Sequence, residues 1–187
     1  MTILVLAIAL GVVAGVAAGG DLTNLSTYRV RAWPLIFAAV LLEMTAGGLP
    51  AGWRWAAAVA AATATAAWCG ANAGTAAAPA GPDLIGVGAA LNTVVMAANR
   101  GMPVSRSALS HSGLPATLDV TRGHLYKHVP MTGHTALAFL GDAIPVAPFT
   151  AVISLGDVIM LVGVAVVVAR AVRGADHGAL PLIAVGA

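Results

Sequence analysis

The chain has 187 residues, of which 59% are hydrophobic and 9% are charged, and its mean hydropathy is +0.92. A soluble domain usually carries about 25% charged residues, so this composition excludes an ordinary soluble protein and predicts an integral membrane protein. The formal net charge of +2 comes from scattered basic residues, which excludes a nucleic-acid-binding surface. The single cysteine, Cys69, excludes an internal disulfide and a cysteine-based metal site.

Apolar segments of nearly membrane-spanning length follow one another along the chain. A spanning helix needs about 20 mostly apolar residues, so we predict an all-α fold, a polytopic membrane helical bundle that forms one domain over residues 1–187. About five spans are expected, at residues 2–20, 34–49, 53–74, 83–99 and 149–172.

The first apolar segment carries no Lys or Arg before Arg29, so we expect a retained span and not a cleaved signal peptide. Gly11, Gly15 and Gly19 recur in it at four-residue spacing. Small residues at this spacing predict a ridge against which another helix packs closely.

Two segments interrupt the spans. Residues 100–133 are the longest polar region and show little periodicity, so they are expected to form a polar loop or lid. Residues 135–148 are apolar but short, and they contain Pro145 and Pro148. A re-entrant or broken helix is therefore expected there, covered by protein or lining a watery cavity.

The basic residues near the ends of the spans predict an orientation. With five spans, Arg29 and Arg31 lie on the same side as Arg170 and Arg173. The positive-inside rule makes that side cytoplasmic, so the polar region 100–133 would face outward.

A five-residue motif occurs twice: Leu-Gly-Asp-Ala-Ile at residues 140–144 and Leu-Gly-Asp-Val-Ile at residues 155–159. Each copy places one carboxyl group, that of Asp142 or Asp157, in an apolar stretch, where an ionised side chain costs roughly 2.5–3.5 kcal/mol. One unbroken helix would hold them about 22 Å apart, but the prolines between them predict a chain that folds back. Two carboxyl groups in a dry site have separated pKa values, which predicts a catalytic acid and base. Alternatively, each aspartate caps a helix or binds backbone groups freed by the prolines.

Further polar residues are candidates for supporting this pair or binding substrate. They are Glu43, Asn92, Asn99, His124, His128 and His134. Asn92 and Asn99 lie on one helix face, where hydrogen bonding between helices is the alternative. Glu43 could instead pair with a basic residue near the membrane surface.

His124 and His128 have the i, i+4 spacing of metal ligands. No acidic residue lies between them and Pro130 limits the helix, so no metal site is expected.

Three motifs carry a resemblance. They are Asn-Arg-Gly-Met-Pro at residues 99–103, Leu-Gly-Asp-Ala-Ile-Pro at 140–145 and Ser-Leu-Gly-Asp at 154–157. The chain resembles a family of small bacterial membrane proteins of unknown activity, which typically show Asn-Gly-Gly-Met-Pro, Leu-Gly-Asp-Ile-Ile-Pro and Ser-Ile-Gly-Asp. Arg100 replaces the usual glycine. The resemblance implies a multi-pass protein of the bacterial inner membrane and brings no activity with it.

A shorter similarity concerns residues 154–163, where Asp157 is followed six residues later by Gly163. This segment is similar to the last-span motif of the type II (lipoprotein) signal peptidases, an Asn-x-Ala-Asp followed by glycine at that distance. The resemblance implies that Asp157 is one catalytic aspartate and Asp142 the other. Ser154 and Gly156 replace the Asn and Ala of that motif, and the Asn-x-x-Asp-Arg element is missing.

We therefore predict a membrane-embedded enzyme that uses Asp142 and Asp157 for acid–base chemistry on a hydrophobic substrate (a lipid, an isoprenoid or a lipopeptide), for example cyclisation or hydrolysis. The alternatives are an aspartyl peptidase resembling lipoprotein signal peptidase, a small transporter or resistance protein, and a non-catalytic membrane scaffold. The expected partners are the lipid bilayer and a hydrophobic small molecule or lipidated substrate. No nucleic acid, metal or cofactor is expected, and a homo-oligomer is left open.

Overall fold

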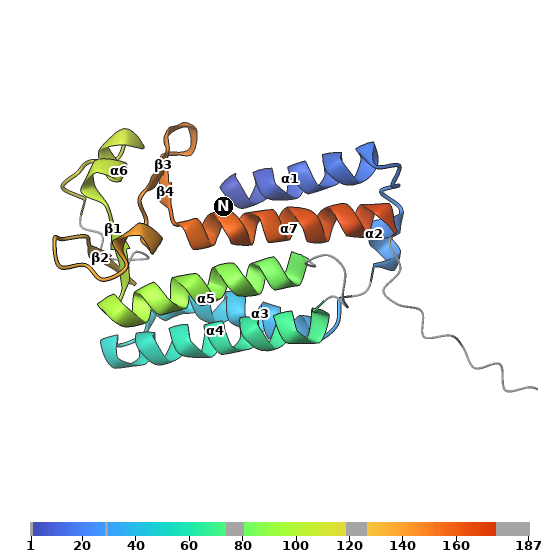
Figure 1. Cartoon of the computed structure of the whole chain (residues 1–187). Helices are drawn as coiled ribbons and strands as arrows, with labels where there is room; N and C mark the ends of the chain where they lie inside the picture. Colours follow the sequence, from blue (N-terminus) through green and yellow to red (C-terminus); the bar gives the residue numbers. More distant parts are fainter. Residues whose placement is uncertain (1, 29, 74–80, 119–126, 175–187) are drawn as a thin grey trace, which may run out of the picture.

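The computed structural model describes residues 2–28, 30–73, 81–118 and 127–174, and most of these are helical (Figure 1). The long helices are α1 (Thr2–Ala17), α3 (Trp33–Thr45), α4 (Ala51–Asn72), α5 (Gly81–Asn99) and α7 (Leu155–Arg173). The short ones are α2 (Asn24–Thr27), η1 (Ala46–Gly48), α6 (Arg106–His111), η3 (Ala138–Leu140) and η4 (Ala147–Phe149). The strands are β1 (Met102–Val104), β2 (His128–Pro130), β3 (Ile144–Val146) and β4 (Ala151–Ile153). The long helices fall on the five predicted apolar segments.

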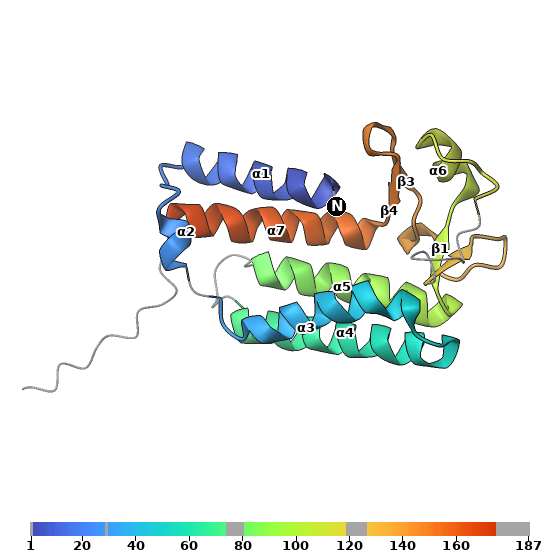
Figure 2. The ribbon, with the colours of Figure 1, turned by 180° about the vertical axis from the view of Figure 1, so that it is seen from behind.

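The long helices run side by side in the order α1, α7, α5, α4, α3, as their mutual contacts show. The two opposite views agree on this arrangement, with α3 against α4 and α1 against α7 (Figure 2). The strands and α6 gather at one end of the bundle, beside the C-terminal end of α5 and the N-terminal end of α7 (Figure 1). This end carries the candidate site.

Glycines bring α5 and α7 into backbone contact. A Cβ atom built on Gly163 would lie 2.8 Å from the carbonyl oxygen of Gly81, closer than real side chains approach. At the other end of the crossing, a Cβ on Gly88 would collide with the carbonyl oxygen of Gly156. The two helices are therefore held at a distance that only glycine permits at these positions.

The predicted glycine ridge of α1 is confirmed for two of its three members. Side chains built on Gly11 and Gly15 would collide with α7, at Ala165 and Val172 respectively. Gly19 lies beyond the helix with φ +86° and has no atom within 4 Å of a built Cβ, so its assignment to the ridge was wrong. Its positive φ ends the helix, which is a conformation that glycine adopts at little cost.

By length and composition alone, two of the long helices, α5 and α7, are long and apolar enough to cross a membrane. The prediction of five spans is not supported. Helix α1 has 16 residues and α3 has 13, and at about 1.5 Å per residue both fall short of a hydrocarbon core of about 30 Å. Helix α4 has 22 residues, and it is not among the helices that are long and apolar enough to cross.

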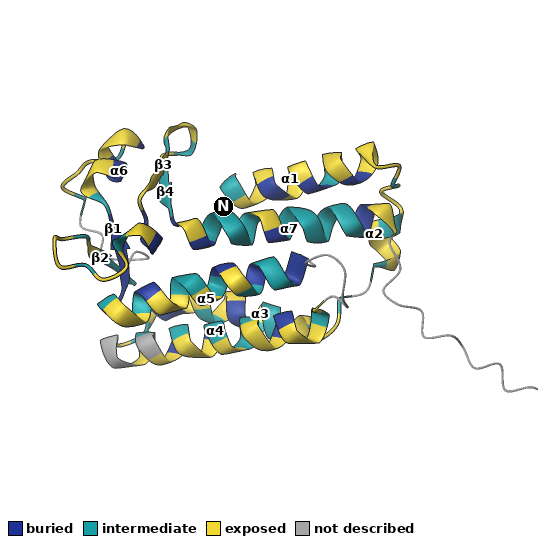
Figure 3. Ribbon diagram, viewed as in Figure 1, coloured by how far each residue is buried: buried dark blue, intermediate teal, exposed yellow. Residues whose placement is uncertain are grey.

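Much of α1 is exposed, as the yellow ribbon of Figure 3 shows, and large apolar residues of α1 and α3 are among the exposed ones. Val5 and Val13 on α1 and Phe37 on α3 are each at least 60% exposed, and Met44 is 79% exposed. A soluble monomer rarely exposes contiguous apolar surface of this extent, so these faces need an apolar environment or partner.

The all-α prediction is wrong for residues 102–153, because four short strands occur there within the described residues. Residues 135–148 form no re-entrant helix. They contain η3, then β3, which pairs antiparallel with β4 through Pro145 and Val152. The chain does fold back at its prolines, as predicted, but as a hairpin, since proline lacks the N–H group and the free φ that a helix requires.

The last helix also begins later than predicted, at Leu155 and not at residue 149. Residues 151–153 are extended in β4, and Ser154 caps the helix. The predicted loop 100–133 contains β1, α6 and β2, with Met102 paired in parallel to His128. Residues 119–126, which include His124, lie outside the described residues.

The end of the bundle opposite the strands gathers the basic segments, as predicted. The backbone N–H of Asp21 and the side-chain amide of Asn24 both donate to the carbonyl oxygen of Val172, at 3.0 and 2.9 Å. The backbone N–H of Arg31 donates to Asn72 Oδ1 at 3.0 Å. Arg31 therefore lies at the same end as the C-terminal turn of α7, and Arg29 lies outside the described residues.

The α5–α7 contact can be tested by replacing glycine with alanine at two helical positions, one at the contact and one away from it. We expect Gly88→Ala to destabilise the protein by roughly 1–3 kcal/mol, because the added methyl group meets backbone. Gly70→Ala on α4 is the matched control: nothing lies within 4 Å of its built Cβ, and alanine should stabilise the helix by up to about 1 kcal/mol. Thermal unfolding of the detergent-solubilised protein measures both. Equal melting temperatures for the two variants would contradict the close approach.

Candidate functional site

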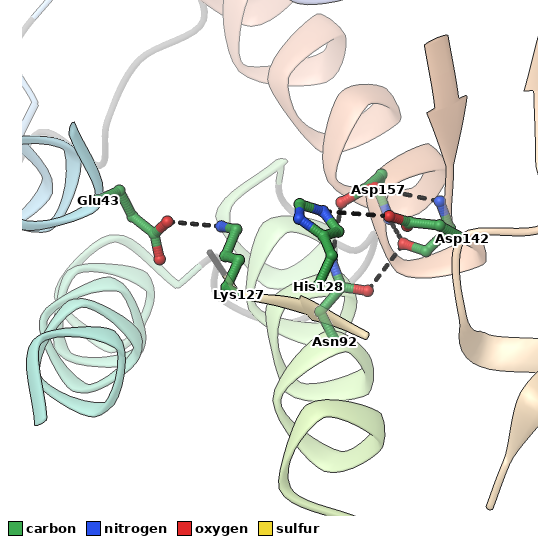
Figure 4. A network of polar contacts seen from close by, with 7 residues as sticks. Glu43, Asn92, Lys127, His128, Asp142 and Asp157 are labelled. Atoms are coloured by element: carbon green, nitrogen blue, oxygen red, sulfur yellow. Dashed lines mark hydrogen bonds and ion pairs between the residues drawn. The ribbon is translucent and has the colours of Figure 1, made fainter. Parts of the chain in front are cut away.

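A cavity of about 810 Å³ lies among α1, α3, α4, α5 and α7. Its volume is in the range of small-molecule sites, roughly 300–1,000 Å³. Aliphatic side chains such as Ile36, Val164 and Val167 line most of it. The charged and amide-bearing lining residues are Glu43, Asn92, Lys127, His128, Asp142 and Asp157, and they gather at the end of the bundle that carries the strands (Figure 4).

Backbone pairing places Asp142 in this cavity. Its N–H donates to the carbonyl oxygen of Pro103 at 2.8 Å, and its carbonyl oxygen accepts from the N–H of Ser105 at 2.9 Å. Asp142 thus pairs with one edge of β1, while β2 pairs with the same strand and carries His128. The strand arrangement therefore brings the side chains of His128 and Asp142 together from opposite edges of β1.

The Asp142 carboxyl is buried, with its side chain 8% exposed, and its Oδ2 lies 3.4 Å from His128 Nε2. Burial raises the pKa of Asp142 above its usual value. The hydrogen bond with His128 opposes this rise, and the nearby carboxyl of Asp157 adds to it. The net effect is a carboxyl group that holds its proton to higher pH than an exposed aspartate.

Asp157 lies in a different environment, at the start of α7. Its N–H donates to Ser154 Oγ at 2.9 Å, and its Oδ2 accepts from the N–H of Ser154 at 3.1 Å, which is a capping box. Its Oδ1 accepts from Asn92 Nδ2 at 2.7 Å, and Ser154 Oγ donates to Asn92 Oδ1 at 2.9 Å. The capping alternative therefore describes Asp157 correctly, although the residue also lines the cavity.

Glu43 and Lys127 form an ion pair beside these two acids. Lys127 Nζ lies 2.5 Å from Glu43 Oε2, and both side chains are partly exposed. The pair links the C-terminal part of α3 to the residue before β2 (Figure 4). The alternative interpretation of Glu43, pairing with a basic residue, therefore agrees with the structure, and the pair still borders the cavity.

The structure brings five of the eight predicted site residues to one cavity, namely Glu43, Asn92, His128, Asp142 and Asp157. Two others, Asn99 and His134, do not line this cavity. Asn99 holds a loop in place: its side chain donates to the carbonyl oxygen of Ala136 at 2.8 Å and accepts from its N–H at 3.0 Å. His134 is exposed and does not line the cavity. The eighth, His124, lies outside the described residues.

Two residues of the site were missed. Ser154 had a readable signal, since Ser-x-x-Asp before an apolar run is a capping-box pattern. Lys127 had none, because its partner Glu43 lies 84 residues away. Among the described residues, no group of three His, Cys, Asp or Glu side chains is placed to hold a metal ion.

Removing the Ser154 hydroxyl tests the capping network. Ser154 is fully buried, and Ser154→Ala leaves Asn92 and the Asp157 N–H without their partner, so we expect a loss of about 1–2 kcal/mol. Ser110→Ala is the control, since Ser110 is exposed and donates only to a carbonyl of its own helix; about 0.5 kcal/mol or less is expected. Thermal unfolding measures both, and equal losses would refute the network.

The raised pKa of Asp142 predicts the pH dependence of stability. Because the folded state binds this proton more tightly than the unfolded state, ionisation destabilises the protein as pH rises through the raised pKa. Asp142→Asn should therefore be the more stable protein at neutral pH, by ~1.4 kcal/mol for each unit by which the pKa is raised. The difference should vanish below the ordinary value of 3.8. Melting temperatures across this pH range measure it, and a variant that is less stable at neutral pH contradicts it.

The sequence model of a family of unknown function (DUF5317) matches residues 27–169 of the chain. All the charged and amide-bearing residues at the polar end of the cavity fall within the matched segment. Neither a curated protein nor a solved structure is similar enough to match the chain.

Proposed function

The chain belongs to this family, whose activity is unknown, and we propose that it is a membrane-embedded enzyme that transfers a proton to or from a hydrophobic substrate. The observation that carries the proposal is the buried Asp142–His128 pair at the polar end of an otherwise apolar cavity. Asp142 is the acid or base, and Asp157 keeps the site in position.

The membrane environment is supported by three features. The composition is strongly apolar, α5 and α7 are long and apolar enough to span, and the outer faces of α1 and α3 expose large aliphatic and aromatic side chains. We propose a multi-pass protein of the bacterial inner membrane, with the shorter helices packed against the two spans.

The chemistry follows from the environment of Asp142. Burial raises the pKa of Asp142, so the carboxyl group holds its proton to higher pH than an exposed aspartate and can act as a general acid; after donating the proton it is a base. The His128 imidazole, 3.4 Å away, is placed to return a proton to it. The apolar cavity would hold a hydrophobic substrate and exclude bulk water, which suits protonation-initiated reactions such as cyclisation or isomerisation.

Asp157 is less suited to be an equal partner in an aspartate dyad. Both of its oxygens already accept hydrogen bonds, from Asn92 Nδ2 and from the N–H of Ser154. A peptidase mechanism with two interchangeable aspartates would have to break these bonds in each cycle. We therefore favour a single proton-transferring group, with Asp157 adding negative charge beside it.

Product analysis tests this proposal. Membranes containing the protein are incubated with total bacterial lipid extract, and the extract is compared by mass spectrometry with that from membranes lacking it. Asp142→Asn should lower product formation by about 10²–10⁴-fold, while Asp21→Asn, an exposed acid at the opposite end of the bundle, should leave it unchanged. Full activity of a folded Asp142→Asn variant would refute the assignment. Retention of a hydrophobic compound without any product would instead favour a transporter or binding protein.

A further inference from the structure

The polar end of the cavity carries more negative than positive charge. Three carboxyl groups line it, those of Glu43, Asp142 and Asp157, against one ammonium group, that of Lys127, and the His128 imidazole. No arginine is among the described lining residues. Lys127 is already engaged with Glu43 at 2.5 Å, so this pair neutralises itself.

The charge that remains is that of the Asp157 carboxylate, because the buried Asp142 holds its proton to higher pH and faces the His128 imidazole. The groups that donate to the Asp157 carboxylate are a side-chain amide and a backbone N–H, and both are neutral. Asp142 is buried beside it and feels its charge. In an apolar cavity such charge interacts strongly with any ionised group that enters, because the effective dielectric constant is low.

The part of the cavity away from the acids is apolar, but it contains one polar group, the indole N–H of Trp68. Trp68 lines it and is only 6% exposed. Its indole Nε1 has no hydrogen-bond partner among the described residues, which is uncommon for a buried polar group. Trp68 packs with Ile85, Ile36 and Val164, and the last two lie on α3 and α7, the helices that carry Glu43 and Asp157. An occupant of the whole cavity would touch the acids at one end and this indole at the other.

We propose that this cavity binds a cationic amphiphile, a hydrophobic molecule whose amine head group lies between Asp142 and Asp157 and whose apolar body extends along α5 and α7 towards Trp68. The inference rests on the proposed function, for which it names the substrate class. An ammonium head group would neutralise the Asp157 carboxylate, whose described hydrogen-bond donors, the Asn92 amide and the Ser154 N–H, are uncharged. A carboxylate or phosphate head would add a third acid to the same dry site.

The test compares three probes that share one alkyl chain and differ in the head group. Dodecylamine, dodecanol and dodecanoate are titrated into the full chain in nanodiscs of neutral phosphatidylcholine, and tryptophan fluorescence is recorded. Dodecylamine should bind at least about tenfold more tightly than dodecanoate. Trp68→Phe should remove most of the fluorescence change, which locates the chain of the probe in the cavity.

Matched acid variants show whether the selectivity comes from the site. Asp157→Asn should reduce the preference for the amine severalfold, whereas Asp21→Asn, which removes an equal charge at the opposite end of the bundle, should not. Empty nanodiscs correct for partitioning into lipid. Equal binding of all three probes, a preference for dodecanoate, or an amine preference unchanged in Asp157→Asn would each overturn the proposal.

The outcomes separate this inference from the proposed function. If the amine preference fails but product formation still depends on Asp142, the head-group assignment is wrong and the enzyme assignment stands. If the amine binds selectively and no product forms in any extract, the cavity is a binding site for cationic amphiphiles and the catalytic assignment fails.

Discussion

The close crossing of α5 and α7 is the constraint on which the rest of the structure depends. Gly88 and Gly156 allow the two backbones to touch, and the residues beside them then meet as well. Asn92 lies one turn after Gly88, and a side chain at position 156 would collide with its Oδ1. The contact that packs the helices therefore also places the Asn92 amide between Ser154 and Asp157.

Two copies of one sequence motif acquire different roles through this packing. The second Leu-Gly-Asp begins a helix, so its carboxyl group turns back to the cap and is held by neighbouring donors. The first ends a short 3-10 turn, and its backbone pairs with β1 and not with a helix. Asp142 consequently points at His128 from a buried position with no cap to satisfy. The two carboxyl groups thus differ in surroundings because the backbone around them differs in conformation, and this difference is why we propose different roles for them.

The three carboxyl groups at the polar end of the cavity differ in burial and in hydrogen-bond partner. Glu43 and Lys127 neutralise each other at the partly exposed rim, Asp142 is buried against an imidazole, and Asp157 is satisfied by neutral donors. Each carboxyl group thus has a different dielectric surrounding and a different partner, which are the two quantities that decide how an acid behaves. This combination of an apolar cavity with differently placed carboxyl groups at one end is what we propose to bind a hydrophobic substrate and to transfer a proton.

The sequence by itself determined where the long helices lie, because apolar segments bounded by Gly, Pro and polar residues leave few alternatives to a helix. It also identified both aspartates, Asn92, His128 and Glu43, since ionisable and amide groups inside apolar segments are costly and therefore informative. The prolines indicated that the helix is interrupted, but they could not show that the chain forms a hairpin. The hairpin depends on the pairing of β3 with β4.

Only the tertiary structure decided that Asp142 is buried against His128, that Lys127 lines the cavity, and that Asn99 and His134 do not. Lys127 meets Glu43, which lies 84 positions away, and Asn99 meets Ala136, which lies 37 positions away. Such contacts are set by how whole elements pack, and no spacing along the chain encodes them.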